Sequence, residues 1–294
     1  MLNRNVETFL ACDREFDNAD TVLFGAPFDS TTSFRPGTRF GPGAIRRESY
    51  GLETYSPYLD LDLEDMSVMD SGDIELCIGS AERALEQIEE RTDKILAAGK
   101  RPFMLGGEHL VTLGAVRSIV NRYPDVHIIH FDAHADLRED YLGVRLSHAC
   151  VLRRCWELTG DGRIHQFGIR SGDREEFKWG KEHVETRLFD FEGLTEKLRS
   201  LKGEPVYFTL DLDVLDPSVF PGTGTPEPGG VSFDELRRAA VLVCRNARIV
   251  GCDVNELCPH YDQSGVSTAV ACKIVREMLL AMGKKVYCSD LSEQ

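Results

Sequence analysis

The 294-residue chain is predicted to form an α/β domain in which helices cover both faces of a mainly parallel sheet. Two observations predict this class. Short apolar runs alternate with amphipathic helical stretches, and the runs are continuously apolar rather than alternating with polar residues. Continuous runs indicate strands covered on both faces, and strands that alternate with helices form parallel sheets. The simplest architecture is a single three-layer αβα domain over residues 1–294, with its core at about 20–283.

Seven apolar runs are the expected strands, because short runs of this kind bounded by turn or charged residues are typical of buried strands. In chain order they cover residues 21–27, 67–70, 102–106, 126–131, 164–169, 206–210 and 249–254. The stretches between several of these runs show helical periodicity. The expected helices cover residues 80–98, 112–122, 190–201, 233–245 and 264–282.

Two glycine-rich stretches are expected to be shaped loops near a substrate pocket. Residues 221–225 lack the lysine and the strand–loop–helix context of a phosphate-binding loop, so they are interpreted as a tight turn. Residues 36–43 are expected to form a similar loop, in which the backbone places Arg39 and gives it no catalytic role.

Composition excludes some functions and favours others. The net charge of −15 argues against a nucleic-acid backbone as partner and, weakly, favours cationic small molecules. No apolar run is long enough to span a membrane, and residues 1–20 lack the features of a signal peptide. The nine cysteines show no paired spacing, so they are expected to be reduced thiols, mostly in the core. Cytoplasm is the expected location.

Polar clusters directly follow four of the expected strands. In an open parallel sheet, ligands bind outside the carboxyl ends of the strands, so these clusters are expected to surround a functional site. The clusters are Glu108 and His109, the DAHAD segment at 132–136, Asp211 with Asp213, and Asp253 with Asn255 and Glu256.

Six of these side chains form a candidate metal centre. If the chain stays extended, alternate residues share a face, so the acids and imidazoles of each cluster point the same way. Four adjacent carboxylates repel one another strongly unless cations neutralise them, and two divalent ions balance four aspartates. Many carboxylate oxygens, two imidazoles and no cysteine favour two Mn²⁺ ions per chain, with other divalent ions as possible substitutes. The six candidate ligands are His109, Asp132, His134, Asp136, Asp211 and Asp213.

These motifs resemble those of the ureohydrolase family of arginases and agmatinases. The resemblance covers about residues 24–282 and is carried by GGEH at 106–109, DAHAD at 132–136, SH at 147–148, DLDVLDPSVFPGTGTPEPGG at 211–230, GTRFGPGAIR at 37–46 and DVNELCPHYDQSG at 253–265. It implies an αβα fold with a dinuclear manganese site, hydrolysis of a guanidino compound to urea and an amine, and a homo-oligomer, either trimer or hexamer. Glu108 departs from the commoner GGDH, at a position that is not a ligand.

The resemblance also implies a division of the six ligands between two ions. The first ion would be held by His109, Asp132, Asp136 and Asp211. The second would be held by His134, Asp132, Asp211 and Asp213. Asp132 and Asp211 would therefore bridge the two ions.

Three residues receive catalytic roles from the resemblance. Glu256 would bind the substrate guanidinium, whose planar fork favours bidentate pairing with a carboxylate. His148 would contact substrate and carry protons at the mouth of the site, because a histidine titrates near neutral pH. Asp136 would pass a proton to the departing amine. His130 lies inside an apolar run and is expected to be a core residue instead.

Agmatine, which would be split into putrescine and urea in polyamine biosynthesis, is the expected substrate. The DAHADLRED…LSHA pattern resembles bacterial agmatinases, and Leu137 and Arg138 stand where arginases carry an asparagine that anchors arginine. Arg138 keeps guanidinobutyrate or guanidinopropionate hydrolases and formimidoylglutamase open, and arginase fits less well. Two other classes are a metal-dependent deacetylase, expected to hold one zinc ion, and an inactive scaffold, which the intact ligand set argues against.

Overall fold

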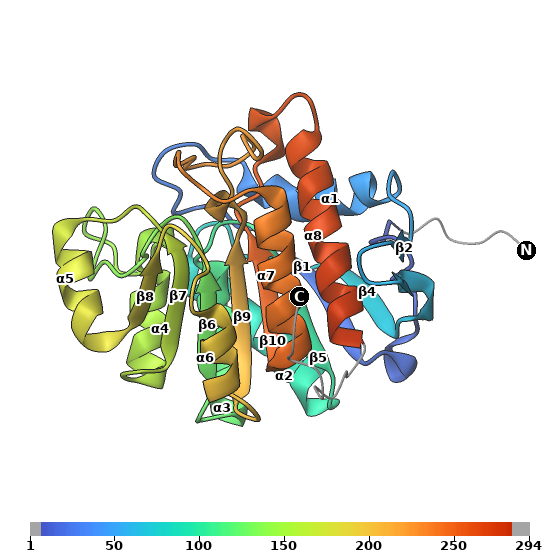
Figure 1. Ribbon diagram of the computed structural model, residues 1–294, viewed down its shortest axis with the longest axis horizontal. Helices are drawn as coiled ribbons and strands as arrows, with labels where there is room; N and C mark the ends of the chain where they lie inside the picture. The colour runs from blue at the N-terminus through green and yellow to red at the C-terminus, as the bar shows by residue number, and fades with distance from the viewer. Residues whose placement is uncertain (1–6, 284–294) are drawn as a thin grey trace, which may run out of the picture.

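The computed structural model describes residues 7–283 and shows one eight-stranded parallel sheet at its centre (Figure 1). Its strands are β1 (Thr21–Ala26), β4 (Val68–Asp73), β5 (Arg101–Gly106), β6 (His127–Phe131), β7 (Ile164–Ile169), β8 (Glu185–Leu188), β9 (Pro205–Asp211) and β10 (Arg248–Asn255). They lie in the order β4-β1-β5-β10-β9-β6-β7-β8, and every neighbouring pair is parallel. A separate antiparallel pair is formed by β2 (Tyr55–Ser56) and β3 (Leu61–Asp62).

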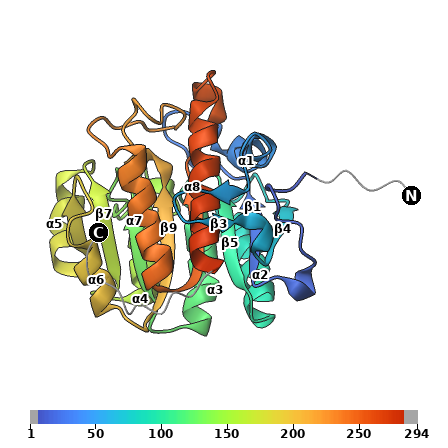
Figure 2. The same ribbon diagram turned by 45° about the vertical axis from the view of Figure 1, so that its right-hand side comes forward.

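Helices cover both faces of the sheet (Figures 1 and 2). One face carries α1 (Gly41–Ser49), α6 (Leu194–Ser200), α7 (Phe233–Asn246) and α8 (Val266–Gly283). The other carries α2 (Ala81–Ala97), α3 (Val111–Arg122) and α4 (Val151–Thr159), with α5 (Arg174–His183) beside the edge strand β8.

Side chains of one strand alternate between the two layers of the core. In β5, Phe103 and Leu105 pack in the cluster that contains α7 and α8, whereas Met104 packs in the cluster that contains α2 and α3. Because both faces are covered, these strands carry continuous apolar runs. The predicted α/β class and three-layer αβα architecture are confirmed.

The predicted elements are all present, although some boundaries differ. β4 runs on to Asp73, and the helix expected at 190–201 begins only at Leu194. That part of the prediction is wrong because Asp190 accepts a hydrogen bond from the N–H of Glu192 and Gly193 follows with φ of 83°, so residues 190–193 form a turn. β8 was not predicted, because as a mostly exposed edge strand it carries no apolar run.

The loop expected at 36–43 is also shorter than predicted. Helix α1 begins at Gly41, and Pro42 lies in its first turn, where the fixed φ of proline suits a helix and its missing N–H costs no bond. Arg39 has a partner beyond the backbone, because its guanidinium pairs with the buried carboxylate of Asp29.

Two predictions from composition can be compared with the described residues. Within residues 7–283, no helix is both long and apolar enough to cross a membrane. The eight cysteines in this range are free thiols and all except Cys77 are buried, as expected for core residues. Cys288, like the ends of the predicted 1–294 domain, lies outside the described residues.

A pair of histidines links β6, β7 and β8 at the end of the sheet opposite the polar clusters. The guanidinium of Arg163 donates to Nε2 of His127 (2.9 Å), so the proton of His127 is on Nδ1. Nδ1 then donates to Nε2 of His165 (2.9 Å), and Nδ1 of His165 donates to Glu185 (3.3 Å). Each ring nitrogen is matched only while both imidazoles are neutral.

This arrangement predicts that the histidine pair contributes stability that is lost in acid. Burial, followed by the charge of Lys197, lowers the pKa of His165 to about 4, below that of an unfolded histidine. Its contribution is therefore present above pH ~6.5 and disappears as the pH falls toward 4, amounting to about 2 kcal/mol between pH 7.5 and 5. In urea unfolding of metal-free protein, His165→Leu should lose less stability over this range than the wild type.

The matched control is His183→Gln. His183 takes no part in the hydrogen bonds of His127 and His165, and it pairs instead with the exposed Asp161. This variant should keep the pH dependence of the wild type. An equal loss of stability in His165→Leu and the wild type would show that the pair does not titrate with unfolding.

Candidate metal centre and active site

A cavity of about 240 Å³ opens at the carboxyl ends of the four central strands. Its lining includes His109 after β5, Asp136 after β6, Asp211 at the end of β9 and Glu256 after β10. These segments are far apart in the sequence and meet because the parallel strands all end at the same edge of the sheet. The volume is below the ~300–1,000 Å³ of sites for drug-sized ligands, so it suits a small molecule.

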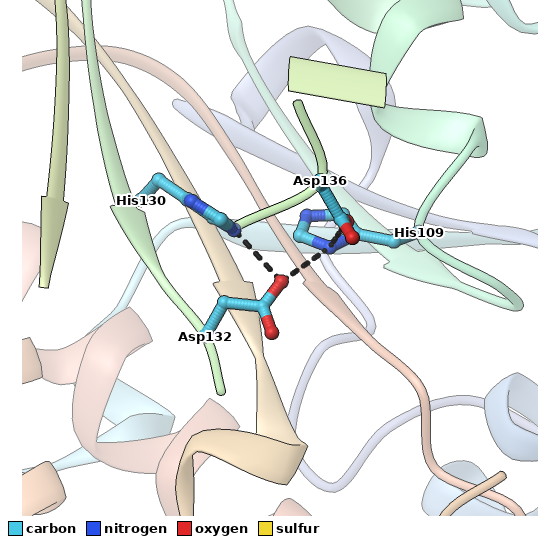
Figure 3. A group of neighbouring side chains, drawn as sticks. All are labelled: His109, His130, Asp132 and Asp136. Carbon is cyan, nitrogen blue, oxygen red and sulfur yellow. Dashed lines mark hydrogen bonds and ion pairs between the residues drawn. The ribbon is translucent and has the colours of Figure 1, made fainter. Parts of the chain in front are cut away.

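The ring of His109 faces three carboxylates at the floor of this cavity. Its Nδ1 atom lies 3.0 Å from Asp132, 3.2 Å from Asp136 and 3.3 Å from Asp211. Figure 3 shows Asp132 and Asp136 directed toward this ring from the segment that follows β6. His109, Asp132 and Asp211 are almost completely buried, so water screens little of the charge. The four residues predicted for the first ion therefore lie together.

A second group shares one carboxylate with the first. Nδ1 of His134 lies 3.0 Å from Asp213 and 3.4 Å from Asp132. Ligand atoms of Asp132, His134 and Asp213 are close enough to hold one ion, and Asp132 also belongs to a group with His109 and Asp136. The structure thus brings all six predicted ligands together, with Asp132 between the two groups.

The backbone that presents these ligands differs from the extended chain predicted for it. Strand β6 ends at Phe131, and Asp136 has a left-handed backbone with φ of 55°. In the other cluster, residues Leu212–Val214 form a 3₁₀ turn, and the N–H of Asp213 donates to the carboxylate of Asp211 (2.8 Å). The prediction of simple alternation was wrong because both segments turn at once after leaving the sheet.

The pKa shifts show how strongly the buried acids interact. Burial and the charge of Asp132 raise the pKa of Asp136 to about 7. Burial, with the charges of Asp213 and Asp132, raises the pKa of Asp211 well above its usual range. Burial favours neutral His109, but hydrogen bonds to Asp132, Asp136 and Asp211 raise its pKa well above the ordinary value. The centre therefore demands additional positive charge.

Hydrogen bonds behind His109 decide which ring nitrogen is available. The hydroxyl of Thr209 donates to Asp253 (2.6 Å), so its oxygen accepts from Nε2 of His109 (2.8 Å). An unprotonated Nδ1 would direct its lone pair at Asp132 and two further carboxylates, so this position needs either a proton or a metal ion between them. Imidazole nitrogen with several carboxylate oxygens suits divalent transition ions such as Mn²⁺. The residues present therefore fit a metal centre.

His130 supports the centre from the core. The amide of Gln166 donates to Nδ1 of His130 (3.0 Å), which leaves Nε2–H to donate to Asp132 (2.8 Å). Gln166 is oriented by its bonds to the carbonyl of Ala135 and the hydroxyl of Thr186. His130 is a buried core residue, as predicted, but its bond to Asp132 was not foreseen. With the proton on Nε2, it orients a ligand instead of binding an ion.

Glu256 lines the cavity and is bonded to the backbone of the predicted ligand His109. Its backbone is left-handed, with φ of 68°, and its N–H donates to the carbonyl of Gly107 (2.9 Å). One carboxylate oxygen accepts from the N–H of His109 (2.7 Å). Burial and the charges of Asp213 and Glu108 raise the pKa of Glu256 well above its usual range, so a cation in the cavity would be favoured beside it.

His148 lies at the wall of the same cavity and is held by the segment that follows β1. Its Nδ1 donates to the carbonyl of Thr31 (3.0 Å), and its Nε2 accepts from the hydroxyl of Ser33 (3.2 Å). Burial lowers the pKa of His148 to about 4, so the ring is neutral at pH 7. A neutral ring with its proton on Nδ1 leaves Nε2 able to accept another.

The remaining loop residues also contribute to the cavity. Thr225, from the stretch 221–225, lines it and donates to Asp213 (3.2 Å). Arg138 lines it as well, but its guanidinium lies 3.2 Å from Asp173 and 3.3 Å from Glu176. Asp173 and Glu176, which also line the cavity, were not predicted, because they belong to α5 and its cap and follow no motif.

Comparisons with known proteins agree with this geometry. The model of the arginase family matches residues 19–281. An agmatinase of Bacillus subtilis is 48% identical over 282 residues, which cover 95% of this chain and 97% of that protein. The crystal structure of a candidate agmatinase from Clostridium difficile superimposes with a TM-score of 0.90 at 50% identity, covering 92% of this chain and all of that one. A mitochondrial guanidino acid hydrolase of Homo sapiens is 33% identical over a match that covers 91% of this chain and 80% of that protein.

The αβα fold and a buried cluster of histidines and aspartates define a metal-binding hydrolase of the ureohydrolase class. The chain belongs to the arginase family.

Because Asp132 lies in both groups, its loss should affect both ions. Elemental analysis of the wild type after loading with manganese is expected to find two ions per chain, and Asp132→Ala is expected to retain neither. The control is Asp216→Ala, since Asp216 binds Ser218, Gly229 and Gly230 outside the centre and its loss should leave both ions in place. Two ions per chain in Asp132→Ala would refute the assignment.

Proposed function

We propose that this protein hydrolyses agmatine to putrescine and urea. The observation that carries the proposal is the charge of the cavity. Beyond the proposed metal ligands, its lining includes the acids Glu256, Asp173 and Glu176, and its one arginine among the described residues, Arg138, is already paired with the last two. A substrate that is cationic at both ends suits such a cavity, and the similarity to agmatinases along most of the chain supports the choice.

The pairing of Arg138 weakens the main alternative. A guanidino acid carries a carboxylate that needs a free cation, but Asp173 and Glu176 neutralise Arg138, which also lies 4.8 Å above the ring of Tyr141. Moving Arg138 to a substrate carboxylate would leave two acids without their partner. Guanidinobutyrate and guanidinopropionate hydrolysis, formimidoylglutamase and arginase activity therefore remain secondary candidates.

We further propose that two Mn²⁺ ions occupy the centre, with the six ligands divided as the family resemblance implies. When bound, divalent ions of this kind lower the pKa of water and stabilise negative charge during hydrolysis.

The chain itself would bind the substrate and move protons. The carboxylate of Glu256 would pair with the guanidinium and orient its planar carbon toward the centre. Nε2 of His148 would accept and return a proton at the cavity wall. Asp136 would pass a proton to the departing amine.

Other proposals rest on the resemblance and the composition. We propose that residues 1–294 form one ureohydrolase-type domain, that the ions in the cell are manganese, and that the chain acts in the cytoplasm as a homotrimer or homohexamer. The acidic composition, with a net charge of −15, supports a small-molecule substrate rather than nucleic acid.

A colorimetric urea assay on the manganese-loaded enzyme tests the substrate. Agmatine is expected to yield urea, with kcat/KM at least about a hundredfold above that for guanidinobutyrate, guanidinopropionate and arginine, because each of those three carries a carboxylate that would find no free cation in the cavity. Formimidoylglutamate is followed by its release of formamide. If the enzyme prefers a guanidino acid, that compound replaces agmatine as the proposed substrate. If it turns over none of these compounds, the proposed reaction is refuted.

His148→Ala tests the role of the cavity wall. The variant is expected to bind two ions and to lose turnover by about a hundredfold or more, the usual size of a proton-transfer contribution. His260→Ala is the matched control, because the ring of His260 packs against Phe40 and does not line the cavity. Unchanged kcat in His148→Ala would show that this histidine has no part in catalysis.

A further inference from the structure

Glu108 precedes a predicted metal ligand but faces away from the centre. It is fully buried, and its carboxylate accepts hydrogen bonds from the segment that follows β1. One oxygen lies 2.5 Å from the hydroxyl of Thr31, and the other lies 3.0 Å from both the N–H of Thr31 and the hydroxyl of Thr32. A buried carboxylate that satisfies three donors fixes the backbone and side chains that carry them.

The segment held by Glu108 is the same one that holds His148. The hydroxyl of Thr31 donates to Glu108, so its oxygen is free to accept from the N–H of His148 (3.1 Å). The carbonyl of Thr31 accepts from Nδ1 of His148 (3.0 Å). One threonine thus joins the carboxylate to both the backbone and the ring of the histidine, and it fixes the ring's tautomer.

We propose that Glu108 is a positioning residue, which acts through Thr31 to hold His148 at the cavity wall, with its Nδ1 bonded to Thr31 and its Nε2 beside Ser33. This inference rests on the proposed function, because it assigns a purpose to the placement of His148. It gives Glu108 no contact with substrate or metal.

The packing around Glu108 explains why the segment can be held so closely. The N–H of Glu108 donates to the carbonyl of Phe28 (2.7 Å), and a Cβ at Gly107 would lie 2.0 Å from that same oxygen. Only glycine at 107 lets the two segments approach to this distance. The residues after β5 therefore pack closely against the residues after β1.

The test is a double-mutant cycle on kcat. Glu108→Ala is expected to lower kcat about ten- to a hundredfold, since misplacement of a catalytic group by about 1 Å costs a factor of this order, with KM and the two bound ions little changed. In the His148→Ala background, the same substitution should have almost no further effect. Equal factors in both backgrounds would overturn the proposal, and so would an unchanged kcat in Glu108→Ala.

A second pair of variants keeps the test decisive if Glu108→Ala does not fold. Thr31→Val removes the shared hydroxyl and should behave like Glu108→Ala, whereas Thr31→Ser keeps the hydroxyl and should retain most of the rate. Ser30→Ala is the control from the same segment, because within residues 7–283 the hydroxyl of Ser30 donates to the carbonyl of Ile78 and to no group of the site. Equal rates in Thr31→Val and Thr31→Ser would contradict the proposal.

Crystal structures of the variants separate this inference from the proposed reaction. In Glu108→Ala or Thr31→Val, His148 should be displaced or disordered while the metal ligands stay in place, whatever substrate the enzyme takes. Lack of urea from any guanidino compound would refute the proposed function. The position of His148 in the variant structures would still show whether Glu108 and Thr31 hold it in place. An unmoved His148 in both variants would refute the inference alone.

Discussion

The repulsion among the buried carboxylates is the constraint on which the rest of the site depends. Nδ1 of His109 lies within 3.3 Å of Asp132, Asp136 and Asp211, and the opposite ring nitrogen, Nε2, donates a hydrogen bond to Thr209. Such a group is stable only with positive charge among its members, supplied by protons or by metal ions. The sheet makes this convergence possible, because β5, β10, β9 and β6 are neighbours and all end at the same edge.

Two carboxylate residues of the site have an uncommon backbone conformation. Asp136 and Glu256 both have positive φ, which is uncommon for residues other than glycine and costs of order 1 kcal/mol or more. Glu256 is held there by its bonds to Gly107 and His109, and the carbonyl of Asp136 accepts from the first turn of α4. These tertiary contacts fix two functional carboxylates where the local sequence alone would not.

The sequence predicts the central strands and the ligands because both follow local rules. A buried parallel strand is continuously apolar, and the polar residues at its end stand out against it, as at Asp132 and Asp211. The left-handed turn at Asp136 and the hydrogen bond from Thr209 to Asp253 could not be predicted, since they depend on contacts between segments that are distant in the sequence. Edge strand β8 is missed for a related reason: its exposed side chains carry no apolar pattern.

The segment from Gly106 to His109 joins the parts of the site that do different chemistry. His109 faces the carboxylates that we propose as metal ligands, and its N–H donates to Glu256, the residue proposed to bind the guanidinium. Glu108 accepts a hydrogen bond from Thr31, and Thr31 in turn accepts one from the N–H of His148. Because Glu108 and His109 are adjacent in sequence, a shift of this segment would move both Glu256 and His148, the groups proposed to bind the cation and to carry protons. The burial and close packing of the segment therefore set the distance between these two groups.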